Sequence, residues 1–143
     1  MSKIVYDAGS MQLMSSFETI THAKLKDLII NENFLLFVVH EGEIAQAIGP
    51  KAFNVRKLEH MFNKRIRITE FASEPVNFIK NLIYPLKVTD ISEEDGVFTL
   101  TPVDSKTRSI LIGKNAGNLR FYESVVKRYF PITEIKVGKQ NGQ

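Results

Sequence analysis

Apolar and polar residues follow helical and strand-like periods in turn along this chain. The first half predicts a helix, two strands, a pair of helices interrupted by a glycine, and a third strand. These elements are expected at Gly9–Ile20, at Lys24–Ile30, at Phe34–Val39, on either side of Gly49 from Gly42 onward, and at Lys64–Phe71. The helix after Gly49 is expected to bury the face formed by Val55, Leu58, Met61 and Phe62.

The second half predicts the same succession of elements. Its first helix has Ser73 as the expected N-cap and Pro75 in the first turn, and it ends before Pro85. A hairpin, two helices interrupted by a second glycine, and a strand follow. They are expected at Leu86–Ile91 and Val97–Leu100 around the turn Glu93–Gly96, on either side of Gly113 up to Tyr129, and at Ile132–Val137. Pro102 is expected to limit the second hairpin strand or to place it at a sheet edge.

The two glycine breaks belong to an internal repeat with an offset of 64 residues. The stretch IGPKAFNVRKLEHMFNKRIRI aligns with IGKNAGNLRFYESVVKRYFPI. The identical pairs include Ile48 and Ile112, Gly49 and Gly113, Ala52 and Ala116, Asn54 and Asn118, and Arg56 and Arg120. We therefore expect an α+β protein of two units packed together, each a three-stranded sheet covered by helices. The expected ranges are residues 1–72 and 73–138, followed by a disordered tail at 139–143.

Charge is unevenly distributed along the 143 residues, although the formal net charge is only +3. Residues 48–70 and 106–130 hold 12 of the 19 Lys and Arg residues but only 3 of the 16 Asp and Glu residues. The two windows together carry +9, and the rest of the chain carries −6. Two basic blocks in an acidic background indicate a protein that binds a polyanion.

Several classes of function are disfavoured by the residues present. The absence of Cys excludes disulfides, thiolate zinc sites and cysteine nucleophiles. The longest apolar run, Phe34–Val39, is far shorter than the roughly 20 residues that span a bilayer, and no signal peptide is visible, so a cytoplasmic protein without membrane contact is expected. The chain has no nucleotide-binding or hydrolase motif, and His22, His40 and His60 lack metal-ligand spacing. We therefore expect no enzyme activity, metal or small-molecule cofactor.

Each glycine break has the layout helix–Gly–x–x–small–helix, which is similar to the core of the K-homology (KH) RNA-binding module. Glycine allows a backbone conformation that a Cβ would oppose and lets a sugar–phosphate chain come close. The start of the following helix offers N–H groups and a positive dipole end to phosphate. Lys51 and Lys114 add positive charge within the two loops. The order of elements resembles the type II arrangement of this module.

The wider sequence resembles the archaeal NusA-like transcription factors over about residues 5–138. The most specific matching stretches are AIGPKAFNVRKLE, FIKNLIYP and LIGKNAGNLR. The resemblance implies two tandem type II KH domains that bind single-stranded RNA, with RNA polymerase or its elongation complex as a candidate second partner. The residues that it assigns to RNA binding are Ile48, Gly49, Pro50, Lys51, Ala52, Asn54, Arg56 and Lys57 in the first loop region, and Ile112, Gly113, Lys114, Asn115, Ala116, Gly117, Asn118 and Arg120 in the second.

The chain departs from the family's loop pattern, IGKGGxNV, in two ways. Ala52 and Ala116 replace the glycine at the fourth loop position, counted from Gly49 and Gly113, and Ala would be favoured there if the position is helical. Pro50 stands where the family usually has Lys and removes an N–H donor, so the first loop is expected to be the weaker binder. Phe53 and Phe121 lie off the apolar helix face, where packing is favoured over contact with RNA.

The expected function is single-stranded RNA binding in transcription elongation, termination or antitermination, with the RNA backbone clamped at the Gly-x-x-Ala loops. Two alternatives stay open. One is a KH factor of ribosome assembly or RNA processing. The other is a KH-derived protein-interaction scaffold with weak or no RNA binding, which the Ala and Pro departures would explain.

Overall fold

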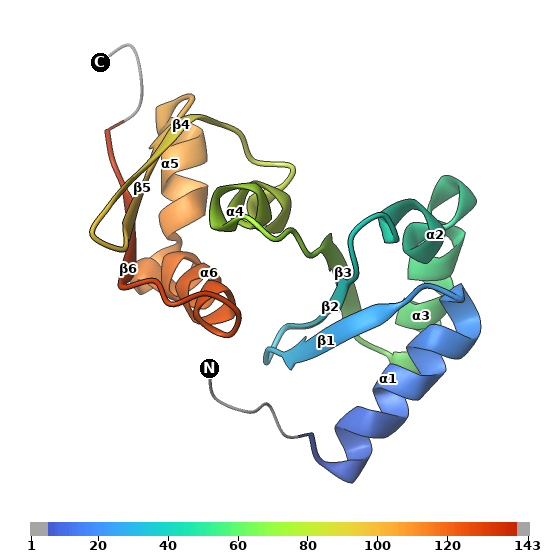
Figure 1. Ribbon diagram of the computed structural model, residues 1–143. Helices are drawn as coiled ribbons and strands as arrows, with labels where there is room; N and C mark the ends of the chain where they lie inside the picture. Colours follow the sequence, from blue (N-terminus) through green and yellow to red (C-terminus); the bar gives the residue numbers. More distant parts are fainter. Residues whose placement is uncertain (1–5, 140–143) are drawn as a thin grey trace. The chain divides into compact units, whose positions relative to one another are not determined.

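A computed structural model describes residues 6–139 of the chain (Figure 1). The described residues form two compact units, one up to Ser73 and the other from Glu74 onward. Each unit has one three-stranded sheet, and both follow the order helix, strand, strand, helix, helix, strand that the sequence pattern predicts. The tail predicted at 139–143 falls outside the described residues except for Lys139. None of the helices in residues 6–139 is long and apolar enough to cross a membrane.

The first unit packs three helices against its sheet (Figure 1). Strand β2 is central, antiparallel to β1 and parallel to β3. Phe17 of α1 stacks on Phe37 of β2 with ring centroids 4.3 Å apart, and Phe37 lies 6.4 Å from Phe62 of α3. These rings form part of a buried core shared by the helices and the sheet. The elements are α1 (Ala8–Thr21), β1 (Leu25–Ile30), β2 (Phe34–Val39), α2 (Ile44–Ile48), the single 3₁₀ turn η1 (Pro50–Ala52), α3 (Phe53–Phe62) and β3 (Arg65–Glu70).

The second unit repeats this topology, with central strand β5 antiparallel to β4 and parallel to β6. Phe78, Leu100 and Val125, which come from a helix, the central strand and another helix, are fully buried. Phe78 also meets Tyr129 edge-on, with centroids 5.4 Å apart. The elements are α4 (Pro75–Ile83), β4 (Val88–Glu94), β5 (Val97–Pro102), α5 (Ser105–Ile112), η2 (Lys114–Ala116), α6 (Gly117–Lys127) and β6 (Glu134–Val137).

Helix starts and one helix face differ from the predictions. Ser73 is not the N-cap of α4; that position is Glu74, which makes no side-chain capping bond. Helix α2 begins at Ile44 and not at Gly42. Met61 is 50% exposed, because the buried line on α3 is centred on Leu58 and is narrower than the predicted face.

The hairpin of the second unit also differs in detail. Strand β4 continues to Glu94, so the turn is only Asp95–Gly96. Both turn residues have positive φ, 53° and 82°, which is typical of a tight two-residue hairpin turn. Strand β5 ends at Pro102, which is one of the two predicted outcomes. The other outcome, an edge strand, is wrong because β5 is the central strand of its sheet.

Two exposed aspartates cap helices in a way that makes stability depend on pH. The Asp104 carboxylate accepts a hydrogen bond of 2.7 Å from the backbone N–H of Thr107 at the start of α5. This bond lowers the pKa of Asp104 below its ordinary value of 3.8, and Asp7 is affected in the same way by Ser10. A lowered pKa stabilises the fold above the unfolded-state pKa, and this contribution is lost as pH falls.

We expect Asp104→Asn to flatten the acid side of the stability curve. Asparagine caps a helix about as well as aspartate but does not titrate, so the variant should lose less stability than the wild type between about pH 5 and pH 2. Thermal melts followed by circular dichroism across this range measure the effect. Asp90→Asn, which removes the same charge from β4, is the control. Equal pH dependence of Asp104→Asn and the wild type would contradict the prediction.

Candidate nucleic-acid interface

The two glycine loops have nearly the same backbone conformation. Gly49 has φ 77° and ψ 169°, and Gly113 has φ 74° and ψ 176°. Each glycine is followed by a three-residue 3₁₀ turn, and the next helix begins directly after the turn, at Phe53 and at Gly117. The repeat seen in the sequence therefore extends to the geometry of the loops.

Glycine is required at the first loop position for two reasons. Its dihedral angles lie in a region that residues with a Cβ rarely adopt. A Cβ at Gly49 would also lie 2.9 Å from Nδ2 of Asn54, and one at Gly113 would lie 2.7 Å from Cγ of Asn118. Both distances are too short for real contacts, so the asparagine occupies the space that glycine leaves open.

The paired asparagines tie together the two helices that flank each loop. Nδ2 of Asn54 donates to the carbonyl of Gln46 in α2 at 3.2 Å, and Nδ2 of Asn118 donates to the carbonyl of Ile110 in α5 at 2.7 Å. The partners Gln46 and Ile110 are themselves 64 residues apart. These bonds indicate that Asn54 and Asn118 hold the loop shape.

The alanines of the two loops are not helical. Ala52 has φ 58° and Ala116 has φ 59°, and the preceding residues Lys51 and Asn115 are also left-handed. The condition under which Ala would be favoured at this position is therefore not met. A Cβ raises the energy of this conformation by about 1–2 kcal/mol, so each loop has a strained residue where the family pattern has glycine.

We expect Ala52→Gly and Ala116→Gly each to stabilise the protein. Relief of the left-handed strain exceeds the added freedom of the unfolded chain, for a net gain of about 0.5–1 kcal/mol and a rise in melting temperature of about 1–4 °C. Thermal melts measure the change. Ala45→Gly in helix α2, where glycine should destabilise, is the control. A lower melting temperature for both loop variants would contradict the prediction.

Positive and polar side chains surround both loops on the outside. Lys51 and Lys57 are exposed at the first loop, and Lys114 and Asn115 are exposed at the second. Helices α3 and α6 begin without a side-chain capping bond, although the backbone N–H groups of their first residues, Phe53 and Gly117, donate to the carbonyls of Pro50 and Lys114 in the preceding turns. Lysine charge, an uncapped helix start and a glycine without a side chain thus meet at one place in each unit.

Arg56 and Arg120 are matched in sequence but differ in their contacts. The Arg56 guanidinium donates to the carbonyl of Lys51 and so braces the first loop. The Arg120 guanidinium lies 3.4 Å from Oε2 of Glu123 in the same helix. Lys127 approaches the other oxygen of Glu123 at 3.7 Å. The arginine of the second unit therefore forms an ion pair within its helix, whereas the arginine of the first unit hydrogen-bonds to the loop backbone.

The remaining predicted residues complete two separate clusters, one in each unit. Ile48 and Ile112 are half-buried at the ends of α2 and α5, and Pro50 is exposed at the start of η1. Phe53, the first residue of α3, is 54% exposed beside its loop, whereas the matching position is Gly117. Phe121 is half-buried, with its ring 6.3 Å from that of Tyr122.

One matched pair of supporting residues was not among the predicted site residues. Oε2 of Glu59 accepts from the N–H of Ile66 at 3.1 Å, and Oε2 of Glu123 accepts from the N–H of Ile135 at 2.9 Å. Each bond joins the helix after the loop to the strand that follows. The 64-residue offset relates Glu59 to Glu123, so the internal repeat in the sequence could have identified this pair.

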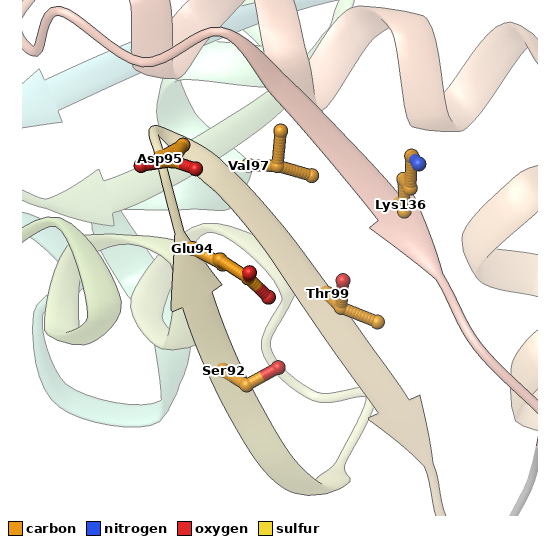
Figure 2. A pocket seen from close by; sticks show the side chains of 6 residues that line it. All are labelled: Ser92, Glu94, Asp95, Val97, Thr99 and Lys136. Atoms are coloured by element: carbon orange, nitrogen blue, oxygen red, sulfur yellow. The ribbon is translucent and has the colours of Figure 1, made fainter.

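A hollow on the sheet of the second unit has different chemistry (Figure 2). Its volume is about 330 Å³, and it is lined by Ser92, Glu94, Asp95, Val97, Thr99 and Lys136. The two carboxylates make this surface unfavourable for phosphate. Among residues 6–139, no group of three His, Asp or Glu side chains is placed to hold a metal ion.

The fold and the paired loops define the class: an α+β protein of two repeated units in a KH-like arrangement. The crystal structure of APE1850 has this fold, with a TM-score of 0.73 and 24% sequence identity over 93% of this chain and 100% of that one. No protein-family model matches the chain.

Proteins named "Probable transcription termination protein NusA" are similar to the chain over most of its length. The one from Methanocaldococcus jannaschii is 28% identical over 99% of this chain and 79% of its own length. Those from Thermoplasma acidophilum and Halococcus morrhuae are each 26% identical, over 96% and 94% of this chain and 97% and 99% of their own lengths. The chain is thus similar to archaeal NusA proteins over most of its length, as the sequence stretches around its loops predict.

Proposed function

We propose that this protein binds single-stranded RNA and acts in transcription termination or antitermination. The observation that carries the proposal is the pair of exposed loops with the same strained backbone, each with a lysine and an uncapped helix start. The similarity to proteins named for transcription termination supports the transcriptional role. A further relative, the "Transcription termination/antitermination protein NusA" of Bacillus subtilis, is 31% identical over 54% of this chain and 21% of its own length.

Each loop would clamp the RNA backbone at its glycine. The bare Cα of Gly49 or Gly113 lets a phosphate approach the start of the next helix, where N–H groups and the helix dipole favour an anion. Lys51 and Lys114 would neutralise the phosphates on either side of the contact. Asn54 and Asn118 would act indirectly, because their amides are engaged in holding the loop.

The two loops are expected to differ in strength. Pro50 has no N–H to donate, whereas Lys114 occupies the same place in the second loop with both an N–H and a charge. The first loop has compensating features in Lys57 and the exposed ring of Phe53, which could stack on a base. We propose that each loop belongs to a type II KH domain, with ranges 1–72 and 73–138, and that RNA polymerase or its elongation complex is a second partner.

Binding to RNA is tested by fluorescence anisotropy with a labelled pool of single-stranded RNA at several salt concentrations. We expect affinity to fall as salt rises, and double-stranded RNA of the same composition to bind more weakly. Absence of binding to the RNA pool at low salt would contradict the proposal and favour the scaffold alternative. Adding the protein to a purified archaeal transcription system then tests whether it changes termination efficiency.

A further inference from the structure

Two hollows lie next to each other at the carboxyl end of α3, in the first unit. The first is about 270 Å³ and has walls of Leu13, Ile30, Leu35 and Phe62. The second is about 430 Å³, and Glu59, Asn63 and Arg65 line it. Lys64 lines both hollows and so forms the boundary between them. An apolar recess therefore adjoins a polar one at a single surface.

The apolar hollow opens to solvent, and an exposed apolar side chain forms part of its wall. Ile30, which lines this hollow, is 53% exposed. A closed apolar cavity of roughly 150 Å³ already holds a molecule the size of benzene, so this recess has room for a leucine or phenylalanine side chain. Burial of such a side chain would also remove apolar surface of Ile30 from water, which is favourable.

The polar hollow carries net positive charge. Lys64 and Arg65 are both exposed, and the acidic residue lining this hollow is Glu59. Oε2 of Glu59 already accepts a hydrogen bond from the N–H of Ile66, so the carboxylate is engaged within the unit. The two cations thus face outward and attract an acidic group placed beside the apolar recess.

We propose that this surface, the Lys64 surface, docks an acidic peptide segment of a partner protein through one apolar anchor. The anchor would enter the recess at Ile30 and Phe62, and neighbouring carboxylates would meet Lys64 and Arg65. The aliphatic walls favour an apolar side chain over the charged backbone of RNA. Helix α3 separates this surface from the Gly49 loop by its ten residues, about 15 Å, so RNA and the peptide can be bound together.

The test uses the full chain and three labelled peptides of equal length. The first has Leu-Phe at the centre of a run of Asp and Glu, the second replaces Leu-Phe by Ser-Ser, and the third replaces the acidic residues by Lys. We expect only the first to bind in fluorescence anisotropy. Methyl resonances of Leu13, Ile30 and Leu35 should shift in NMR spectra when it is added.

Two variants locate the binding. Ile30→Asp and Lys64→Glu, both at exposed positions, should each weaken the first peptide by about tenfold or more, whereas Val103→Asp, an exposed apolar position in the other unit, should not. RNA affinity of Ile30→Asp should stay close to the wild-type value. The proposal is overturned if the first peptide does not bind, if it binds both variants unchanged, or if single-stranded RNA displaces it and Ile30→Asp weakens RNA.

Discussion

Charge reversal in both glycine loops should weaken binding of single-stranded RNA by about a hundredfold or more. The variant combines Lys51→Asp, Lys114→Asp and Asn115→Asp. It removes two cations and places three carboxylates where phosphates would approach, and each lost charge-assisted contact contributes about 1.5–3 kcal/mol. The slope of log affinity against log salt should also become shallower, by about one, because fewer counterions are released. Fluorescence anisotropy at several salt concentrations measures both effects.

The control makes the same change in net charge away from the loops. Lys87→Asp, Ser92→Asp and Lys136→Asp change exposed positions of the second unit and also lower the net charge by five. If the control lowers the affinity for RNA as much as the loop variant does, long-range electrostatics and not the loops govern binding. If neither variant weakens RNA, the loop clamp is wrong.

Reversal in one loop alone shows whether the loops act on one strand. When two weak sites bind the same RNA, the second site acts at the effective concentration that the first creates. On a long RNA, Lys114→Asp with Asn115→Asp should therefore remove most of the affinity, although the first loop is unchanged. On an RNA too short to reach both loops, Lys51→Asp should have little effect because the second loop is the stronger site.

Gly113→Ala should destabilise the protein by about 2–3 kcal/mol, with a fall in melting temperature of about 5–10 °C. The dihedral angles of Gly113 are nearly exclusive to glycine, and the new Cβ would lie 2.7 Å from Cγ of Asn118. Asn118→Ala removes the contacts with Cγ and Nδ2 but leaves the Cβ of residue 118 at 3.0 Å from the new Cβ, and it does not remove the backbone strain. The double variant should therefore be more stable than the sum of the two single effects, by about 0.5–1 kcal/mol.

Gly117→Ala provides a matched control within the same loop. Gly117 has φ −61°, begins α6, and has no atom within 4 Å of an added Cβ. The substitution should be neutral or slightly stabilising, because alanine is the better helix former. Chemical denaturation of the wild type, the two single variants, the double variant and Gly117→Ala measures these differences. Equal destabilisation by Gly113→Ala and Gly117→Ala would show that the loop does not need its glycine conformation.

The duplicated architecture could be predicted because several levels of the sequence agree. The 64-residue offset, the strand runs and the glycine breaks all indicate the same two units, and Gly49 and Gly113 take the same dihedral angles in the structure. Helix starts and buried faces were predicted less well, because the same side chain can make different contacts in the folded protein. Ser73 has the chemistry of an N-cap, yet the chain enters α4 at Glu74, and Met61 fits the helical period but lies in solvent.

The inner support of the loops could not be predicted from residue types alone. Alanine has the highest helix propensity, so propensity favours a helical Ala52, whereas the loop holds it left-handed. The repeat identifies Asn54 as equivalent to Asn118 but does not say that their amides bond to the preceding helix. Such contacts depend on how two helices meet, which is information that spacing along one chain does not contain.

The parallel pairing of β2 with β3, and of β5 with β6, has a topological consequence. Parallel neighbours need a connection that crosses the sheet, and in both units that connection contains the glycine loop. The loop thus lies near the middle of a connection whose two ends lead into hydrogen-bonded strands. A ligand bound at the loop therefore contacts the segment that joins the central strand of each sheet to its parallel neighbour.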